Sequence, residues 1–282
     1  MYDNSFTRRN PGFLVIMIDQ SGSMCATSQN NGIELAEIAS NSVNNLITGL
    51  ICRLCGVDVN GNEFIHRRVK ICLIGYGGPN NEAYCILKDS EHPDGCMWID
   101  EIDEKFPMGK VKVATREGLF AQDCIEVVKP VAEGIPNISN AMYMAKDLVF
   151  DWMRSHNTAE DAVPYIINFT NDYITDNGET IKIVNEISEM HIPDGSPLVI
   201  NCFVSNNTPF HTNPFEDSFY VDNTQFLYKI SSETPTNMKE RMREYGFETE
   251  KLFIHISNYW DLLEFLWQLF LHPMWNPKLK LR

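Results

Sequence analysis

One carboxylate and two hydroxyls occupy alternate positions near the start of the chain, as Asp19, Ser21 and Ser23, with Gly22 between the serines. All three side chains offer hard oxygen ligands, which suit Mg²⁺ or Mn²⁺. A tight turn containing a glycine brings such side chains together. The residue types and their spacing therefore indicate a candidate site for a divalent metal ion.

The residues before this turn predict where it lies. An unbroken apolar run over 13–18, rich in β-branched residues, follows Pro11-Gly12 and ends at the polar turn. Such a run is typical of a parallel strand buried on both faces by helices. In open α/β sheets, ligands bind at the carboxyl ends of the strands.

A loop carboxylate at a binding site contributes little to the stability of the core. We therefore expect Asp19→Ala to leave folding nearly intact.

The rest of the chain alternates between helix-like and strand-like patterns. Apolar residues at helical spacing predict helices over 33–55, 138–154, 180–190 and 258–271. Apolar runs predict buried strands over 69–76, 165–170 and 198–204, an edge strand within 83–87, and short elements at 226–230 and 238–243. The predicted fold class is α/β, with a three-layer, doubly wound, mostly parallel central sheet in a single domain over 1–282.

The stretch 88–131 has poor periodicity and two Pro- and Gly-containing breaks, at 92–95 and 106–109. It is longer than an ordinary connection between elements. We expect an irregular insertion, with a small hairpin around 111–114. Such an insertion either binds a partner or is a surface elaboration.

Composition excludes some classes of partner. The net charge of −15 repels nucleic-acid phosphates and anionic membranes, but it attracts divalent cations or a basic protein. Apolar runs are too short for a secretory signal or a membrane span. Eight cysteines, several in apolar contexts, predict free thiols in a reducing compartment. We therefore expect a cytoplasmic protein without nucleic-acid or membrane partners.

The buried strand, the Asp-x-Ser-x-Ser turn and the following Met24 together resemble the metal-ion-dependent adhesion site of the von Willebrand factor A (vWA) domain family. Within that family, the chain resembles bacterial stand-alone intracellular vWA proteins of the tellurium-resistance-associated type. The resemblance implies a Rossmann-like fold, in which Ser21 and Ser23 bind Mg²⁺ or Mn²⁺ directly and Asp19 acts through water. It also implies that a carboxylate of a protein partner completes the coordination.

The second loop of the family's site departs from the usual pattern here. The family usually offers a threonine just before a helix, and the matching stretch of this chain places Pro136 at that position. Proline has no side-chain donor atom. This ligand is therefore lost unless Asn137 or Ser139 replaces it.

The third loop is altered as well. The family usually ends the strand in Thr-Asp-Gly, with a further Asp a few residues on, whereas this chain has Thr170, Asn171 and Asp172, with Asp176 after them. An amide accepts hydrogen bonds from metal-bound water but brings no charge, and Asp172 is the alternative ligand. We expect a weakened Mg²⁺ or Mn²⁺ site formed by Asp19, Ser21, Ser23, Asn171 and Asp172.

These features predict a protein–protein interaction or regulatory scaffold module rather than an enzyme. The sequence contains no phosphate-binding loop, dinucleotide fingerprint, His-Glu-x-x-His motif or nucleophile elbow. One alternative is a metal-free vWA subunit of a larger complex, held through the 88–131 stretch. The other is a metal-dependent hydrolase, for which a base or nucleophile beside the turn is missing.

Overall fold

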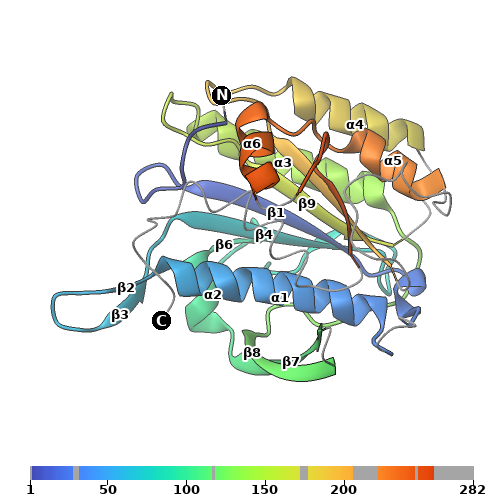
Figure 1. Ribbon diagram of the computed structural model, residues 1–282, viewed down its shortest axis with the longest axis horizontal. Coiled ribbons are helices and arrows are strands. Elements are labelled where there is room, and N and C mark those ends of the chain that lie inside the picture. Colours follow the sequence, from blue (N-terminus) through green and yellow to red (C-terminus); the bar gives the residue numbers. More distant parts are fainter. Residues whose placement is uncertain are drawn as a thin grey trace.

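The computed structural model describes residues 2–27, 32–115, 118–171, 177–205, 222–244 and 247–256. Strand β1 (Gly12–Asp19) runs through the centre of the main sheet, and all of its residues are buried. Helices cover both faces of this sheet (Figure 1). The buried strand predicted over 13–18 is therefore confirmed.

Seven strands of the described residues form the main sheet. In spatial order they are β11 (Phe253–Ile256), β10 (Leu198–Val204), β9 (Tyr165–Thr170), β1, β4 (Val69–Tyr76) and β5 (Tyr84–Cys85), with β6 (Cys96–Trp98) also paired to β4. Neighbours from β11 to β4 run parallel, whereas β5 and β6 run antiparallel to β4. The predicted α/β class with a mostly parallel sheet is confirmed. Strand β11 was not predicted, because it has only four residues and includes the buried polar His255.

The strand order reverses at the centre of the sheet. After β1 the chain crosses to β4 on one side, whereas β9, β10 and β11 follow one another on the other side of β1. The reversal lies between β1 and β9. In doubly wound sheets the crevice outside such a reversal point is where ligands bind.

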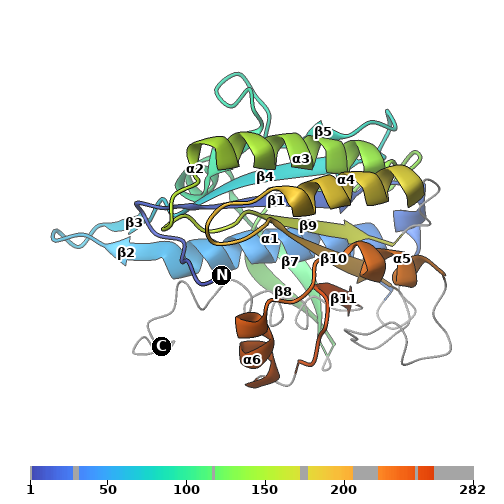
Figure 2. The same ribbon diagram turned by 90° about the horizontal axis from the view of Figure 1, so that it is seen from above.

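Helices form the two outer layers (Figures 1 and 2). One face carries α1 (Leu35–Leu54) and α2 (Ile99–Lys105), and the other carries α3 (Ile138–Ser155), α4 (Asn177–Glu189) and α5 (Asp222–Ile230). The final described helix is α6 (Thr236–Glu244). Helices α1, α3 and α4 confirm three of the four predicted helices, and α5 and α6 account for the two short elements. The helix predicted over 258–271 lies outside the described residues.

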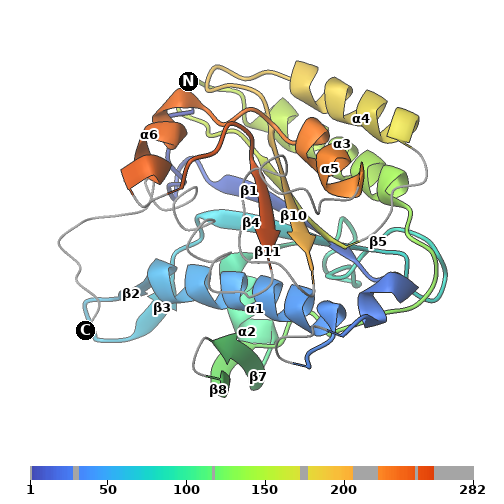
Figure 3. The same ribbon diagram turned by 45° about the vertical axis from the view of Figure 1, so that its right-hand side comes forward.

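Within the described residues, two hairpins lie outside the main sheet. The first, β2 (Cys55–Val57) with β3 (Glu63–Ile65), extends from the end of α1. The second, β7 (Met108–Thr115) with β8 (Gly118–Ile125), lies beyond α1 and α2 (Figure 3). The stretch 88–131 is thus more regular than its periodicity suggested, because it supplies β6, α2 and this longer hairpin. That the stretch is an insertion stays a prediction.

All eight cysteines are free, as predicted. Four are buried, one is half-buried, and Cys25, Cys52 and Cys55 are exposed.

Over the described ranges, no helix combines the length and the apolar character needed to cross a membrane.

Candidate functional site

Asp19 ends β1 at the point where the strand order reverses. In the parallel register, Asp19 lies beside Tyr76 of β4, and Ile18 pairs with Phe169, so that Asp19 is level with Thr170. The Thr170 hydroxyl donates to Asp19 Oδ2 at 2.6 Å. The backbone N–H of Ser21 donates to Asp19 Oδ1 at 2.9 Å. Both oxygens of this fully buried carboxylate therefore accept hydrogen bonds.

The two serine hydroxyls lie next to each other. The Oγ atoms of Ser21 and Ser23 are 3.0 Å apart, and a short 3-10 helix, η1 (Gly22–Cys25), fixes the turn that holds them. Ser21 is fully buried, whereas Ser23 is half-buried. Neighbouring ligands of an octahedral Mg²⁺ ion with bonds of about 2.1 Å are about 3.0 Å apart. The spacing of the two hydroxyls therefore suits two adjacent ligands of one ion.

A second loop is fastened to the turn through the backbone. The Glu133 N–H donates to the Gln20 carbonyl at 2.8 Å, and the Gly22 N–H donates to the Gly134 carbonyl at 3.0 Å. Gly134 has a φ of +76°, and a Cβ atom there would lie 1.9 Å from the Gly78 carbonyl oxygen. A glycine is required at this position, because the second loop passes close to the backbone that follows β4.

The residues expected to replace the missing threonine have other partners. The Asn137 side-chain oxygen accepts the Asn140 N–H at 3.1 Å and caps the start of α3. The Ser139 hydroxyl lies 2.9 Å from the Thr180 hydroxyl of α4. Asn137 therefore caps α3, and Ser139 joins α3 to α4. Pro136 offers no side-chain ligand.

The third loop is described only at its start. Asn171 is half-buried and directly follows Thr170 at the end of β9, next to β1. The structure thus places Asn171 beside the residue that bonds Asp19. Asp172 and Asp176 lie outside the described residues, so their predicted roles stay predictions.

The donor set at this edge consists of oxygen atoms. Within the part of the chain that the structure describes, no group of three His, Cys, Asp or Glu side chains is placed to hold a metal ion. The candidate site instead combines one carboxylate with the hydroxyls of Ser21, Ser23 and Thr170. Hard oxygen donors of this kind fit Mg²⁺ or Mn²⁺, which keep several water ligands.

Sequence analysis missed a buried polar chain that starts at the site. The Tyr76 hydroxyl donates to Asn168 Oδ1 at 2.8 Å, and Asn168 Nδ2 donates to Asn201 Oδ1 at 3.0 Å. Asn201 in turn donates to the Ser231 hydroxyl at 3.0 Å, at the end of α5. Buried amides must be hydrogen-bonded. A single asparagine inside each of the apolar strands β9 and β10 was the signal available.

A further contact that was not predicted holds the turn from the edge of the sheet. The Tyr84 hydroxyl of β5 donates to Gln20 Oε1 at 2.8 Å. The Gln20 side chain is buried. Because Gln20 separates Asp19 from Ser21, this bond positions the turn without adding a metal ligand.

Comparison with known proteins yields structural likeness alone. No family model matches the sequence, and no curated protein sequence matches it. Among solved structures, the pilus adhesin SpaC from Lactobacillus rhamnosus GG is 10% identical with a TM-score of 0.47, over 96% of this chain and 31% of the adhesin. A manganese-loaded TRAP protein from Plasmodium vivax is 11% identical with a TM-score of 0.39, over 93% of this chain and 74% of that protein. The chain thus spans under a third of the adhesin.

Proposed function

We propose that this protein is a binding module of the vWA type that holds Mg²⁺ or Mn²⁺ at the turn after β1 and binds a protein partner there. The observation that carries the proposal is the pair of hydroxyls, Ser21 and Ser23, 3.0 Å apart beside the buried Asp19 at the reversal point of the sheet. Ligands bind at this point in doubly wound folds.

Each residue has a distinct part in this proposal. Ser21 and Ser23 would hold the cation directly, because their Oγ atoms lie 3.0 Å apart. Asp19 supplies negative charge and keeps the turn in shape through its bonds to Ser21 and Thr170. The cation supplies positive charge that a carboxylate of the partner recognises. An anionic partner group needs such a charge, because the chain itself carries −15.

We infer further that the protein is a cytoplasmic binding or scaffold protein and not an enzyme. The support is the sequence, which lacks nucleotide-binding and hydrolase motifs, together with eight free cysteines. A metal-free module is the second candidate. Its support is that both oxygens of Asp19 already accept hydrogen bonds from the protein.

Calorimetric titration of the purified protein with Mn²⁺ tests the metal site. We expect one saturable site, and Ser21→Ala should weaken it by about tenfold or more, since a lost ligand costs at least ~1.4 kcal/mol. Ser188→Ala is the matched control, because Ser188 is an exposed serine whose hydroxyl bonds Asn185 within α4. Absence of saturable binding to the wild type would favour the metal-free module. Equal binding to wild type and Ser21→Ala would place the ion elsewhere.

Gentle purification from the native cell tests the partner. Proteins that co-purify in the presence of Mg²⁺ should be lost in a chelator and in the Ser21→Ala variant, but retained by Ser188→Ala. Recovery of the same partners under all four conditions would show that binding does not use this site.

A further inference from the structure

Three cysteines that are distant in sequence meet on the outer side of β4. Cys72 lies on β4, Cys85 on β5 and Cys96 on β6. Cys72 is directly opposite Cys96 in the antiparallel register of β4 and β6. The sulfur atoms of Cys72 and Cys85 are 3.8 Å apart. Cys72 is therefore the central thiol of the group, with one neighbour on each of two short strands.

Cys72 and Cys85 differ in access to solvent and in pKa. Cys72 and Cys96 are buried, whereas Cys85 is half-buried. The Cys72 thiol donates to the Cys85 sulfur, and this hydrogen bond, with the charge of Lys88, lowers the pKa of Cys85. The pKa of Cys72 is raised, because its hydrogen bonds with Cys85 and Cys96 and its burial favour the thiol. The lowered pKa thus belongs to a thiol that is partly exposed to solvent.

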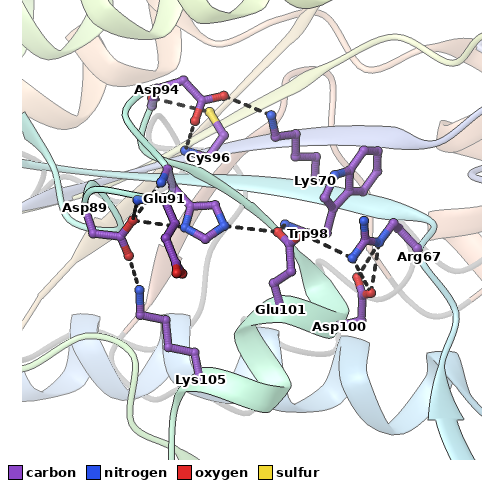
Figure 4. Close-up of polar contacts among 11 residues, drawn as sticks. Arg67, Lys70, Asp89, Glu91, Asp94, Cys96, Trp98, Asp100, Glu101 and Lys105 are labelled. Atoms are coloured by element: carbon purple, nitrogen blue, oxygen red, sulfur yellow. Dashed lines mark hydrogen bonds and ion pairs between the residues drawn. The ribbon is translucent and has the colours of Figure 1, made fainter.

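The loop between β5 and β6 holds the thiols close together. Asp94 pairs with Lys70 at 2.9 Å, and its other oxygen accepts the Cys96 N–H at 3.2 Å (Figure 4). Gly95 has a φ of +71°, and a Cβ atom there would lie 2.3 Å from Cys85 Cβ. The loop backbone therefore packs directly against Cys85.

An ion pair and a histidine contact hold the same loop against α2. Asp89 pairs with Lys105 (Figure 4). Asp89 also accepts the His92 N–H at 2.7 Å, and the His92 ring lies 3.4 Å from Glu101. These contacts join the middle of the loop to one helix. The short distance between the thiols is therefore a property of the folded chain and does not depend on a transient opening.

We propose that Cys85 is a site of oxidation by hydroperoxides and that Cys72 resolves the oxidised sulfur to form a Cys72–Cys85 disulfide. Hydrogen peroxide is the simplest such oxidant. A low-pKa, accessible thiol beside a resolving thiol is the arrangement that favours this chemistry. The proposal does not depend on the metal site.

The reaction balances with peroxide as the only co-reactant. The Cys85 thiolate attacks one peroxide oxygen, the O–O bond breaks, and a sulfenic acid and hydroxide form. The Cys72 sulfur then attacks the Cys85 sulfur, the S–O bond breaks, and water leaves with the Cys72 proton. The proton that Cys85 released neutralises the hydroxide. Two thiols lose two electrons, and one peroxide becomes two waters.

Peptide mapping of the full chain after brief exposure to hydrogen peroxide tests this proposal. In the wild type we expect a Cys72–Cys85 disulfide that forms about tenfold faster than oxidation of the exposed Cys25, because Cys85 has a resolving thiol 3.8 Å away. In Cys72→Ser, dimedone should trap a sulfenic acid at Cys85. Cys25→Ser is the matched control and should behave like the wild type.

Three outcomes would overturn the proposal. They are oxidation of Cys85 no faster than that of Cys25, equal dimedone trapping in wild type and Cys72→Ser, and a Cys72–Cys96 disulfide that forms equally fast in Cys85→Ser. If Cys72→Ser does not fold by circular dichroism, Cys72→Ala replaces it. The disulfide mapped in the wild type decides between support and contradiction without either variant.

Discussion

At the scale of single residues, Asp19 combines the position of a ligand with the burial of a core residue. It is fully buried and accepts hydrogen bonds from the Thr170 hydroxyl and the Ser21 N–H. A loop carboxylate was expected to contribute little to folding. That expectation is inconsistent with these contacts, because the Thr170 bond fastens β1 to β9 at the reversal point of the sheet.

Asp19→Ala should therefore lower the free energy of unfolding by about 1–3 kcal/mol, since it leaves two buried donors without their acceptor. Urea denaturation of wild type and variant measures this difference. Thr170→Val is the companion variant, and in a double-mutant cycle the two losses should be less than additive. A loss within about 0.5 kcal/mol, as for an ordinary surface substitution, would contradict this role.

Substitution of Asn171 should change the charge of the metal site rather than the stability of the fold. Asn171→Asp restores the residue that the vWA resemblance implies, and a carboxylate near the cation adds attraction on the order of a few kcal/mol at an effective dielectric of ~20. Mn²⁺ or Mg²⁺ affinity measured by calorimetry should rise by about tenfold or more. Asp172→Ala is the control and should have a smaller effect. Loss of binding in Asp172→Ala, with no change in Asn171→Asp, would make Asp172 the ligand.

At the scale of elements, α1 helps to position the second loop of the site. Asn44 of α1 donates to the Val128 carbonyl at 2.8 Å, and its side-chain oxygen accepts the N–H groups of Val127 and Val128. The Thr48 hydroxyl accepts the Ile125 N–H at 3.0 Å. The backbone at the end of β8 and just after it is thus hydrogen-bonded to side chains of α1. It leads to Glu133, which bonds the turn.

Asn44→Ala should cost about 1–3 kcal/mol of stability, because buried backbone groups lose their partners. It should also weaken Mn²⁺ binding, since the second loop is no longer held beside the turn. Denaturation and calorimetry measure the two effects. Asn45→Ala is the matched control, because this neighbouring buried amide donates within its own helix to Asn41. Unchanged Mn²⁺ affinity in Asn44→Ala would show that α1 does not position the site.

The elements that sequence analysis found are those with a continuous local signal. The run over 13–18 is apolar throughout, and the run over 69–76 is apolar except for the half-buried Lys70. Their burial on both faces follows from that composition. Strand β6 and helix α2 were missed because they are short and their stability comes from pairing with β4 and from contacts such as Arg67 with Asp100. Pairings of this kind join residues that are distant in sequence.

The site shows the same division between local and distant information. The Asp19, Ser21 and Ser23 turn is visible because its residues are adjacent in the sequence. The bond from Thr170 joins residues that are 151 positions apart, so it depends on the strand order. The thiol group of β4, β5 and β6 depends on the same pairings. Which strands become neighbours is therefore the information that local pattern does not contain.

At the scale of the whole molecule, we propose binding rather than catalysis, because the turn and the acidic charge suit a bound cation. The turn lies at the reversal point of the sheet, and the net charge of −15 concentrates cations near the surface. Divalent ions alone do not make a hydrolase. A base or a nucleophile placed beside the ion is also needed.

Purified protein with Mg²⁺ or Mn²⁺ should therefore hydrolyse a phosphoester such as p-nitrophenyl phosphate, or ATP, no faster than the buffer with the same ion. Absorbance and released phosphate measure the two reactions. Ser21→Ala separates true turnover from contamination. Sustained turnover in the wild type that disappears in this variant would show that the protein is an enzyme.

The proposed function requires that one divalent cation binds between Ser21 and Ser23 at the carboxyl end of β1. Anomalous diffraction from crystals of the protein soaked in Mn²⁺ locates the ion among the side chains. We expect one strong peak within bonding distance of both serine Oγ atoms, which is lost in crystals of Ser21→Ala. A peak at another place, or none at saturating Mn²⁺, would show that the cation does not bind between these serines.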